Sequence, residues 1–460
     1  MSLEKVNKVY FIGAGGIGMS ALARYFNSKG LEVAGYDKVA TPLTDQLIEE
    51  GIDIHFVDDT LQLPSWAHDF SEEVMVVYTP AIPADHNELN FLKSLGYKLF
   101  KRSEVLGMIT RESVTVAVAG THGKTTTSSL LAHIFTETKF GCNAFLGGIA
   151  TNYDSNVLLD SKSNTTVVEA DEYDRSFLTL YPDVAIVTSM DADHLDIYGS
   201  KDYLEESFNL FIDQIKDGGK LIRKANLPLD SGITYSIEEE ADYQALNVHV
   251  SEGRYQFDLK HPNGLIENVT VGLPGSHNVE NAIAAFAVAA EMGVDLDLLV
   301  GALASFEGVK RRFEYHIKTS KLVYIDDYAH HPEELRACIQ SVKELYPDKK
   351  ITGIFQPHLY SRTRDFADGF AETLAELHEV ILLDIYPARE LPIEGVSSNM
   401  LLDKIPGDNK ALLQKKEVVD DLKERELEVL LTLGAGDIDQ LVDPIREELE
   451  AQLRQFKTED

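Results

Sequence analysis

The segment AGTHGKTTT at residues 119 to 127 combines glycines, a lysine and threonines directly after an apolar run. This pattern is typical of a strand that turns through glycines into a helix. In such a turn, backbone N–H groups hold phosphate oxygens, the lysine faces the β- and γ-phosphates, and a threonine hydroxyl can bind Mg²⁺. A complete P-loop has one more glycine, at the position of Val118, so this is a shortened variant, and a simple helix start is the alternative. We predict an ATP site with these members: Gly120, Thr121, His122, Gly123, Lys124, Thr125 and Thr126.

Two later segments contain side chains that could hold the metal. Glu169 ends the apolar run in VVEADEYD, at a strand tip where an oxygen ligand of Mg²⁺ belongs. His194 lies between two aspartates in DADHLDIY, which favours metal or phosphate chemistry over a purely structural histidine. Some of the acids that follow Glu169 are expected to form a solvated face. Thr125 and Glu169 are therefore the predicted metal ligands, with His194 as a further candidate.

An earlier glycine turn follows the first strand pattern. Its glycines form GxGxxG, and Asp37 ends the next strand pattern, where an acid that binds a ribose would lie. NAD or FAD is the usual ligand of such a turn, a nucleotide-sugar is an alternative, and a turn without a ligand is the third possibility. The predicted ligand-binding set is Gly13, Ala14, Gly15, Gly16, Ile17, Gly18 and Asp37.

Three polar clusters near the C-terminal third remain. The first is DDYAHHP at residues 326 to 332, where adjacent histidines cannot easily face one zinc ion, so substrate or nucleotide contact is favoured. The second is FQPHLYSRTR, in which Arg362 and Arg364 are a candidate anion clamp, with a surface ion pair as the alternative. The third is the pair Arg311 and Arg312, to which the same interpretation applies.

Alternating strand and helix patterns place these segments. They predict parallel α/β units at the start of the chain, again from residue 114 and again from about residue 321, with antiparallel strands between 232 and 275. One helix is predicted over 363 to 378. We predict an α/β protein with a Rossmann-like N-terminal domain, a central P-loop ATPase-type domain with some antiparallel strands, and a C-terminal Rossmann-like domain. The expected boundaries are 1–109, 110–312 and 313–460.

The composition limits the partners. The chain has 460 residues, and 42 basic against 76 acidic residues give a net charge of −34, which disfavours nucleic acid and anionic membranes. Two cysteines, no signal-peptide pattern and no apolar run of about 20 residues predict a cytoplasmic protein without membrane insertion. We expect a monomer or a weak homodimer. Two phosphate-bearing ligands favour a kinase or ligase over an oxidoreductase.

In this order and over nearly the whole chain, the motifs resemble those of the Mur ligase family. They are AGTHGKTTT, VVEADEYD, DADHLDIY, SHNVENA, RRFE, IDDYAHHP, FQPHLYSRTRDF, IYPARELPIEG and LGAGDI. The resemblance implies that the first glycine turn holds the diphosphate of UDP-N-acetylmuramate. It also implies that ATP phosphorylates the lactyl carboxylate, that L-alanine attacks the acyl phosphate, and that the reaction belongs to peptidoglycan precursor synthesis.

The resemblance also assigns individual residues. Lys124, His194 and Arg312 would be catalytic, with His194 at a second Mg²⁺ site. ATP would contact Asn278, Arg312 and Asp327, and Asn281 would contact the UDP-sugar. The amino acid would contact Tyr328, His330 and Arg362.

Two positions depart from the family pattern. Leu359 stands where close relatives often have arginine, which leaves open the choice of L-alanine over glycine or L-serine. Asn209 stands where several other members carry a carbamylated lysine, so no such modification is expected. The nearest alternative function is a ligase that reattaches recycled tripeptide to the same sugar; remote ones are an NAD-dependent oxidoreductase and a non-catalytic nucleotide-sugar sensor.

Overall fold

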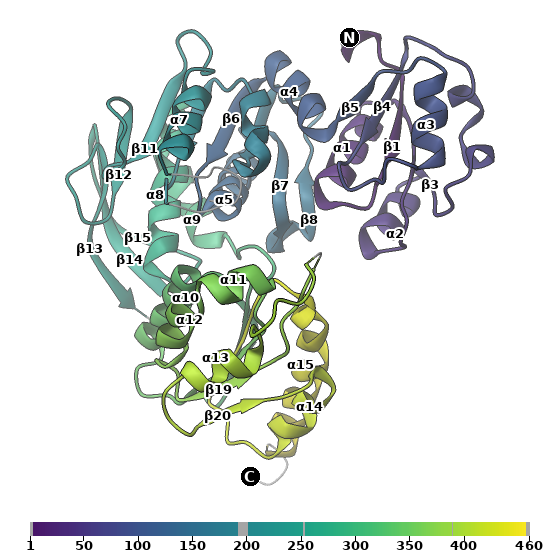
Figure 1. Ribbon diagram of the computed structural model, residues 1–460. Coiled ribbons are helices and arrows are strands. Elements are labelled where there is room, and N and C mark those ends of the chain that lie inside the picture. Colours follow the sequence, from purple (N-terminus) through teal and green to yellow (C-terminus); the bar gives the residue numbers. More distant parts are fainter. Residues whose placement is uncertain (1–2, 192–200, 252–253, 389, 457–460) are drawn as a thin grey trace. The chain divides into compact units, whose positions relative to one another are not determined.

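The computed structural model describes residues 3–191, 201–251, 254–388 and 390–456. Three sheets follow one another along the chain (Figure 1), each with helices in the α/β manner. Contacts divide the chain into two compact units. The first contains residues 1–249, 256–272 and 278–307, and the second contains 250–255, 273–277 and 308–460. The predicted α/β class is confirmed, while the three domain boundaries stay predictions.

The first sheet is parallel and has the order β3-β2-β1-β4-β5. The order reverses beside β1, and ligands of such sheets bind at that point, outside the carboxyl ends of the strands. The predicted glycine turn leaves β1 there. The elements are β1 (Lys8–Ile12), α1 (Ile17–Ser28), β2 (Glu32–Tyr36), α2 (Pro42–Glu49), β3 (Asp53–His55), β4 (Val74–Tyr78), α3 (Asn87–Ser94), β5 (Leu99–Lys101) and α4 (Arg102–Glu112).

The second sheet has ten strands in the order β15-β14-β13-β12-β11-β10-β6-β9-β7-β8. Its centre is parallel, and β14 and β15 are neighbours joined by two residues, which requires an antiparallel hairpin. The prediction of antiparallel strands between 232 and 275 is wrong for β12, because β12 pairs parallel with both β11 and β13. The strands are β6 (Val114–Ala119), β7 (Asn143–Ala150), β8 (Ser155–Leu158), β9 (Thr165–Ala170), β10 (Val184–Val187), β11 (Lys220–Lys224), β12 (Ile233–Ser236), β13 (Tyr243–Ser251), β14 (Arg254–His261) and β15 (Gly264–Val271). The helices are α5 (Lys124–Glu137), α7 (Lys201–Ile212), α8 (Ser276–Glu291) and α9 (Leu296–Ser305).

The third sheet has the order β16-β17-β21-β18-β19-β20, and β16 is its antiparallel edge. The predicted helix over 363–378 is wrong in one respect, because the backbone leaves helical geometry at Phe366 (φ −113°, ψ 15°) and two short helices result. The strands are β16 (Glu314–Lys318), β17 (Val323–Asp327), β18 (Ile351–Phe355), β19 (Glu379–Leu382), β20 (Lys410–Leu412) and β21 (Val429–Leu433). The helices are α10 (Pro332–Leu345), α11 (Tyr360–Asp365), α12 (Ala367–Leu374), α13 (Ser398–Lys404), α14 (Lys415–Lys423) and α15 (Val442–Phe456).

Apolar packing joins the first two sheets. One continuous core contains Val9 and Phe26 from the first sheet region together with Ala117 and Phe145 from the second. The glycine turn and the phosphate loop therefore lie on two parts of one packed unit. Short 3₁₀ helices complete the described chain at Leu3–Lys5, Thr60–Gln62, Ser65–Ala67, Thr151–Tyr153, Tyr173–Thr179 and Asp437–Leu441. Within the described ranges, every helix is too short or too polar to cross a bilayer.

Candidate active site

The predicted phosphate loop lies between β6 and α5, and its backbone requires glycine at two positions. Gly120 has φ +139°, and a Cβ there would lie 2.0 Å from the Thr188 hydroxyl. Gly123, the N-cap of α5, has φ +81°, and a Cβ there would lie 2.6 Å from the Asn281 side-chain oxygen. Both φ values lie in the left-handed region that favours glycine. The N-terminus of α5 is thereby left open to an anion, as a phosphate site requires.

Residues after β10 hold this loop, and the sequence analysis did not single them out. The Ser189 hydroxyl accepts a hydrogen bond from the His122 backbone N–H at 2.7 Å and lies 2.9 Å from the Thr121 hydroxyl. Thr121 in turn accepts one from the Asp191 N–H at 3.1 Å. The only sequence signal for this role was two hydroxyl residues directly after a buried strand.

Lys124 is held inside the loop by a buried acid. Its ammonium donates to the Gly120 carbonyl at 2.7 Å and lies 2.8 Å from Glu172 Oε2. The Glu172 side chain is fully buried, so it does not belong to the solvated face predicted for some acids of this segment. Burial lowers the pKa of Lys124, but Glu172, Glu169 and Asp171 outweigh it and raise that pKa above its usual value. Lys124 is therefore a protonated cation at neutral pH.

The predicted metal ligands Thr125 and Glu169 meet in the structure. The buried Thr125 hydroxyl donates to Glu169 Oε1 at 3.1 Å, and the Gly147 N–H donates to Glu169 Oε2 at 3.1 Å. A hydroxyl oxygen beside a carboxylate provides two oxygen ligands, which Mg²⁺ prefers. His194, the predicted second-site ligand, lies outside the described residues.

Asn278 and Asn281 lie on α8, and Asn281 contacts α5, the helix that follows the phosphate loop. The Asn281 amide N–H donates to Asn278 Oδ1 at 3.2 Å, and the Thr127 hydroxyl donates to Asn281 Oδ1 at 3.2 Å. The structure thus brings Asn281 to the loop that carries Lys124. Its assignment to the UDP-sugar stays a prediction.

The first glycine turn leads from β1 into α1. Gly13 has φ +90°, and Gly16 is the N-cap of α1 without a side-chain cap, so the first N–H groups of that helix are available to an anion. Asp37 accepts a hydrogen bond from the Gly15 N–H at 2.6 Å, which fixes the turn. The predicted set Gly13–Gly18 with Asp37 is therefore assembled in one place.

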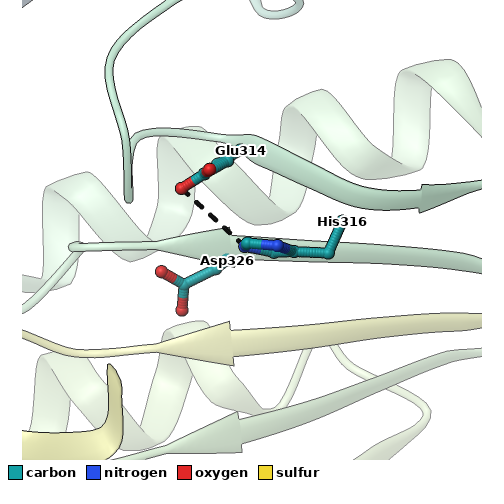
Figure 2. Close-up of side chains that lie close together, drawn as sticks. All are labelled: Glu314, His316 and Asp326. Atoms are coloured by element: carbon teal, nitrogen blue, oxygen red, sulfur yellow. Dashed lines mark ion pairs between the residues drawn. The ribbon is translucent and has the colours of Figure 1, made fainter. Parts of the chain in front are cut away.

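Arg311, in the second unit, is fully engaged with acids and backbone. Its Nε donates to Asp326 Oδ2 at 3.0 Å, and one Nη donates to the Gly434 carbonyl at 2.7 Å. Figure 2 shows that Glu314 and His316 of β16 lie beside Asp326 of β17. His316 Nε2 and Glu314 Oε2 are 3.7 Å apart. The fully buried Asp326 also accepts from Thr432 at 2.6 Å. Since both Asp326 oxygens accept hydrogen bonds, from Arg311 and Thr432, we interpret Asp326 as the ion-pair partner of Arg311 and not as a metal ligand.

We expect Arg311→Ala to lower the free energy of unfolding by about 3–5 kcal/mol, because it leaves the buried Asp326 charge without its partner. Urea unfolding of the full chain, followed by circular dichroism, measures this. The matched control is Arg364→Ala. Its pair with Asp365 is about half exposed, so this substitution should change the free energy of unfolding far less. Equal effects of the two substitutions would refute the structural role of Arg311.

Four further predicted residues lie near the carboxyl ends of β17 and β18, also in the second unit: Asp327, Tyr328, His330 and Arg362. Asp327 accepts hydrogen bonds from the backbone N–H groups of Phe313 and Ala329, each at 2.7 Å, while burial raises its pKa to about 7. His330 faces His358, with ring centroids 5.9 Å apart. Burial is the main cause that lowers the pKa of both histidines, that of His358 to about 4. Both are neutral at pH 7.

Tyr328 is half-exposed, and the Arg362 charge contributes to the lowered pKa values of both His330 and His358. The structure thus brings three predicted amino acid contacts, Tyr328, His330 and Arg362, to one edge of the third sheet. Sequence analysis missed His358 and also Tyr386, whose ring stacks on His358 at 5.7 Å. His358 lies in the quoted motif FQPHLYSRTRDF, so a signal for it existed.

Three family models match the chain in succession. They are the Mur ligase family catalytic domain at residues 8–113, the Mur ligase middle domain at 118–289 and the Mur ligase glutamate ligase domain at 311–438. The chain belongs to the Mur ligase family. The resemblance seen in the sequence motifs is confirmed, and with it the ligase class of this Mur ligase.

Similar proteins cover the same length. UDP-N-acetylmuramate–L-alanine ligase of Flavobacterium johnsoniae is 51% identical over 98% of this chain and 99% of the relative. The crystal structure of UDP-N-acetylmuramate–alanine ligase from Thermotoga maritima has a TM-score of 0.82 at 28% identity, with 97% of this chain and 99% of that one covered. A murein peptide ligase from Psychrobacter arcticus has a TM-score of 0.69 at 22% identity, over 96% and 98% of the two chains, and shows the shared fold.

Proposed function

We propose that this Mur ligase joins L-alanine to the lactyl carboxylate of UDP-N-acetylmuramate, with ATP as the energy source, in peptidoglycan precursor synthesis. The relative from Flavobacterium johnsoniae carries that substrate and amino acid in its name, and its identity of 51% extends over nearly the whole chain. The structural observation that carries the proposal is the phosphate loop, in which the Lys124 cation and the Thr125–Glu169 oxygen pair lie together. An oxidoreductase would have no use for this second phosphate site.

The reaction needs an activated acyl group, because a carboxylate would have to expel oxide when an amine attacks it. The lactyl carboxylate oxygen attacks the γ-phosphorus of ATP, the bond to the bridging oxygen breaks, and ADP leaves. The amine of L-alanine then attacks the acyl carbon, loses a proton, and inorganic phosphate leaves. The chain must therefore hold three substrates and keep the acyl phosphate away from water.

Lys124 and the N-terminus of α5 stabilise negative charge on the transferring phosphoryl group. Thr125 and Glu169 would hold Mg²⁺, which supplies further charge neutralisation at the β- and γ-phosphates when bound. Before nucleotide binds, Glu172 keeps the Lys124 ammonium protonated inside the loop. His194, Arg312 and Asp327 stay predicted contacts of the nucleotide, and Tyr328, His330 and Arg362 stay predicted contacts of the amino acid.

The tripeptide-recycling ligase stays the nearest alternative, because the murein peptide ligase of Psychrobacter arcticus has the same fold. The two functions use the same sugar and differ in the amine that attacks. The identity of 51% to an L-alanine ligase favours the amino acid over the peptide.

The test is release of inorganic phosphate from ATP with UDP-N-acetylmuramate and, in turn, L-alanine, glycine, L-serine and the tripeptide. We expect the highest kcat/KM with L-alanine. The ratio of the kcat/KM values for L-alanine and glycine measures how selective an enzyme with Leu359 at this position is. Mass spectrometry of the product identifies the new amide. Turnover with tripeptide but not with L-alanine would overturn the proposal, and ATP hydrolysis without an amide product would indicate a sensor.

A further inference from the structure

A cavity of about 250 Å³ in the first unit connects the first glycine turn with the predicted metal ligand Glu169. Its lining includes Gly18 at the start of α1, Arg102 at the start of α4, Phe145 and Gly147 of β7, and Glu169 of β9. Ligand pockets of proteins have volumes of roughly 300–1,000 Å³, so this cavity is large enough for part of a ligand. It extends from the first turn of α1 to Glu169, whose carboxylate accepts a hydrogen bond from Thr125 at the start of α5.

Arg102 forms one wall of this cavity and packs against the first turn of α1. A Cβ built on Gly18 would lie 2.8 Å from Arg102 Cδ and 3.0 Å from its Nη1, so glycine at position 18 makes room for the guanidinium. Gly18 is the second residue of α1, and its neighbours there carry the open N–H groups of that helix. The guanidinium and the helix N-terminus thus face the same space.

Within the part of the chain that the structure describes, the Arg102 side chain forms no hydrogen bond and no ion pair. Its side chain is partly buried, and it shares the cavity with Glu169, whose two oxygens accept from Thr125 and Gly147. The other arginines of this region are engaged: Arg24 pairs with Glu50, and the Arg111 guanidinium lies 4.1 Å from the Tyr181 ring centroid. A guanidinium that no acid of the chain occupies can bind an oxyanion of a ligand through paired N–H donors.

The reaction supplies such an anion and creates a need for this cation. A carboxylate must approach a triphosphate, and both are negatively charged, in a chain whose net charge is −34. A helix N-terminus provides only about half a positive charge. A full charge between the glycine turn and the phosphate loop would reduce the repulsion and hold the substrate in place.

We propose that Arg102 is a substrate-binding residue that pairs with an oxyanion of the nucleotide-sugar, in the cavity between α1 and Glu169. The proposal rests on UDP-N-acetylmuramate as the substrate. Two oxyanions of that one molecule have the required chemistry, the diphosphate and the lactyl carboxylate. Planar guanidinium groups bind both through paired N–H donors, and lysine replaces such a contact incompletely.

The test is calorimetric titration of the full-length protein, without ATP or metal, with two ligands. UDP-N-acetylmuramate carries both oxyanions, whereas UDP-N-acetylglucosamine carries the diphosphate alone. We expect Arg102→Gln to weaken binding of UDP-N-acetylmuramate at least tenfold, and Arg102→Lys to restore part of the loss. Arg111→Gln, at the other end of α4, is the matched control with unchanged affinity.

The two ligands separate the sources of the anion. Equal losses for both ligands assign Arg102 to the diphosphate, and a loss confined to UDP-N-acetylmuramate assigns it to the carboxylate. Unchanged affinity for both, with unchanged thermal unfolding, would overturn the proposal. The KM for ATP should stay constant in all variants. If the KM for ATP rises together with the loss of sugar binding, the substitution has disturbed the structure as a whole, and this outcome also counts against a binding role of Arg102. Wild-type protein that fails to bind UDP-N-acetylmuramate would overturn the proposed function itself.

Discussion

Lys124→Ala is expected to lower kcat about a thousandfold or more and to leave the affinity for UDP-N-acetylmuramate nearly unchanged. The Lys124 ammonium is buried, donates to Gly120 and carries a raised pKa, so it is a fixed cation in the loop where phosphoryl transfer is proposed. The proposed sugar site lies on the first sheet, at the turn into α1. Steady-state kinetics and titration of UDP-N-acetylmuramate measure the two effects separately.

One confounding effect must be removed from this experiment. Lys124→Ala leaves the fully buried Glu172 carboxylate without its partner, and breaking a buried pair costs about 3–5 kcal/mol of stability. The double variant Lys124→Ala with Glu172→Gln removes both charges and should recover most of that stability, but none of the activity. Lys139→Ala, at an exposed site just beyond α5, is the control for loss of a positive charge. Parallel loss of turnover and of sugar affinity would refute the assignment of the two ligands to separate sites.

The sequence predicted those parts of the site that depend on local order along the chain. Glycines next to a strand and before a helix predict a left-handed turn, and Gly13, Gly120 and Gly123 have the positive φ values that this chemistry requires. The α/β class followed from the alternation of strand and helix patterns. These signals need no knowledge of which segments meet in space.

Features that depend on tertiary pairing could not be predicted in this way. Glu172 stands among acids that resemble a solvated face, and only the tertiary structure shows that it is buried beside Lys124. Arg311 and Arg312 are adjacent and identical in type, yet Asp326 and Gly434 engage Arg311. Arg102 belongs to none of the motifs, and its place beside Gly18 is set by the packing of α4 near α1.

The positions of a few cations explain how a chain with a net charge of −34 can bind anions. An acidic protein that binds ATP and a UDP-sugar needs positive potential where they bind. Lys124 and Arg102, with the N-termini of α5 and α1, supply it in the first unit. This accounts for the specific binding of anions without positive charge over the whole surface.

Glu169→Gln is expected to lower kcat about a hundredfold or more and to raise the Mg²⁺ concentration for half-maximal activity at least tenfold. The substitution keeps the shape of the side chain but removes its charge and turns one oxygen acceptor into an N–H donor. That donor would face either the Thr125 hydroxyl or the Gly147 N–H, which both donate to Glu169 in the structure. The oxygen pair proposed for the metal is lost in either orientation.

Two measurements separate loss of the metal from loss of structure. Electron paramagnetic resonance titration of Mn²⁺ in the presence of ATP reports metal binding directly, and thermal unfolding reports the fold. Glu137→Gln, at the exposed end of α5, removes an equal charge from the same region and should change neither metal binding nor activity. If Glu169→Gln bound Mn²⁺ with the affinity of the wild type, Glu169 would not be a metal ligand, and Asp171, two residues further on and also in the cavity lining, would be the next residue to replace.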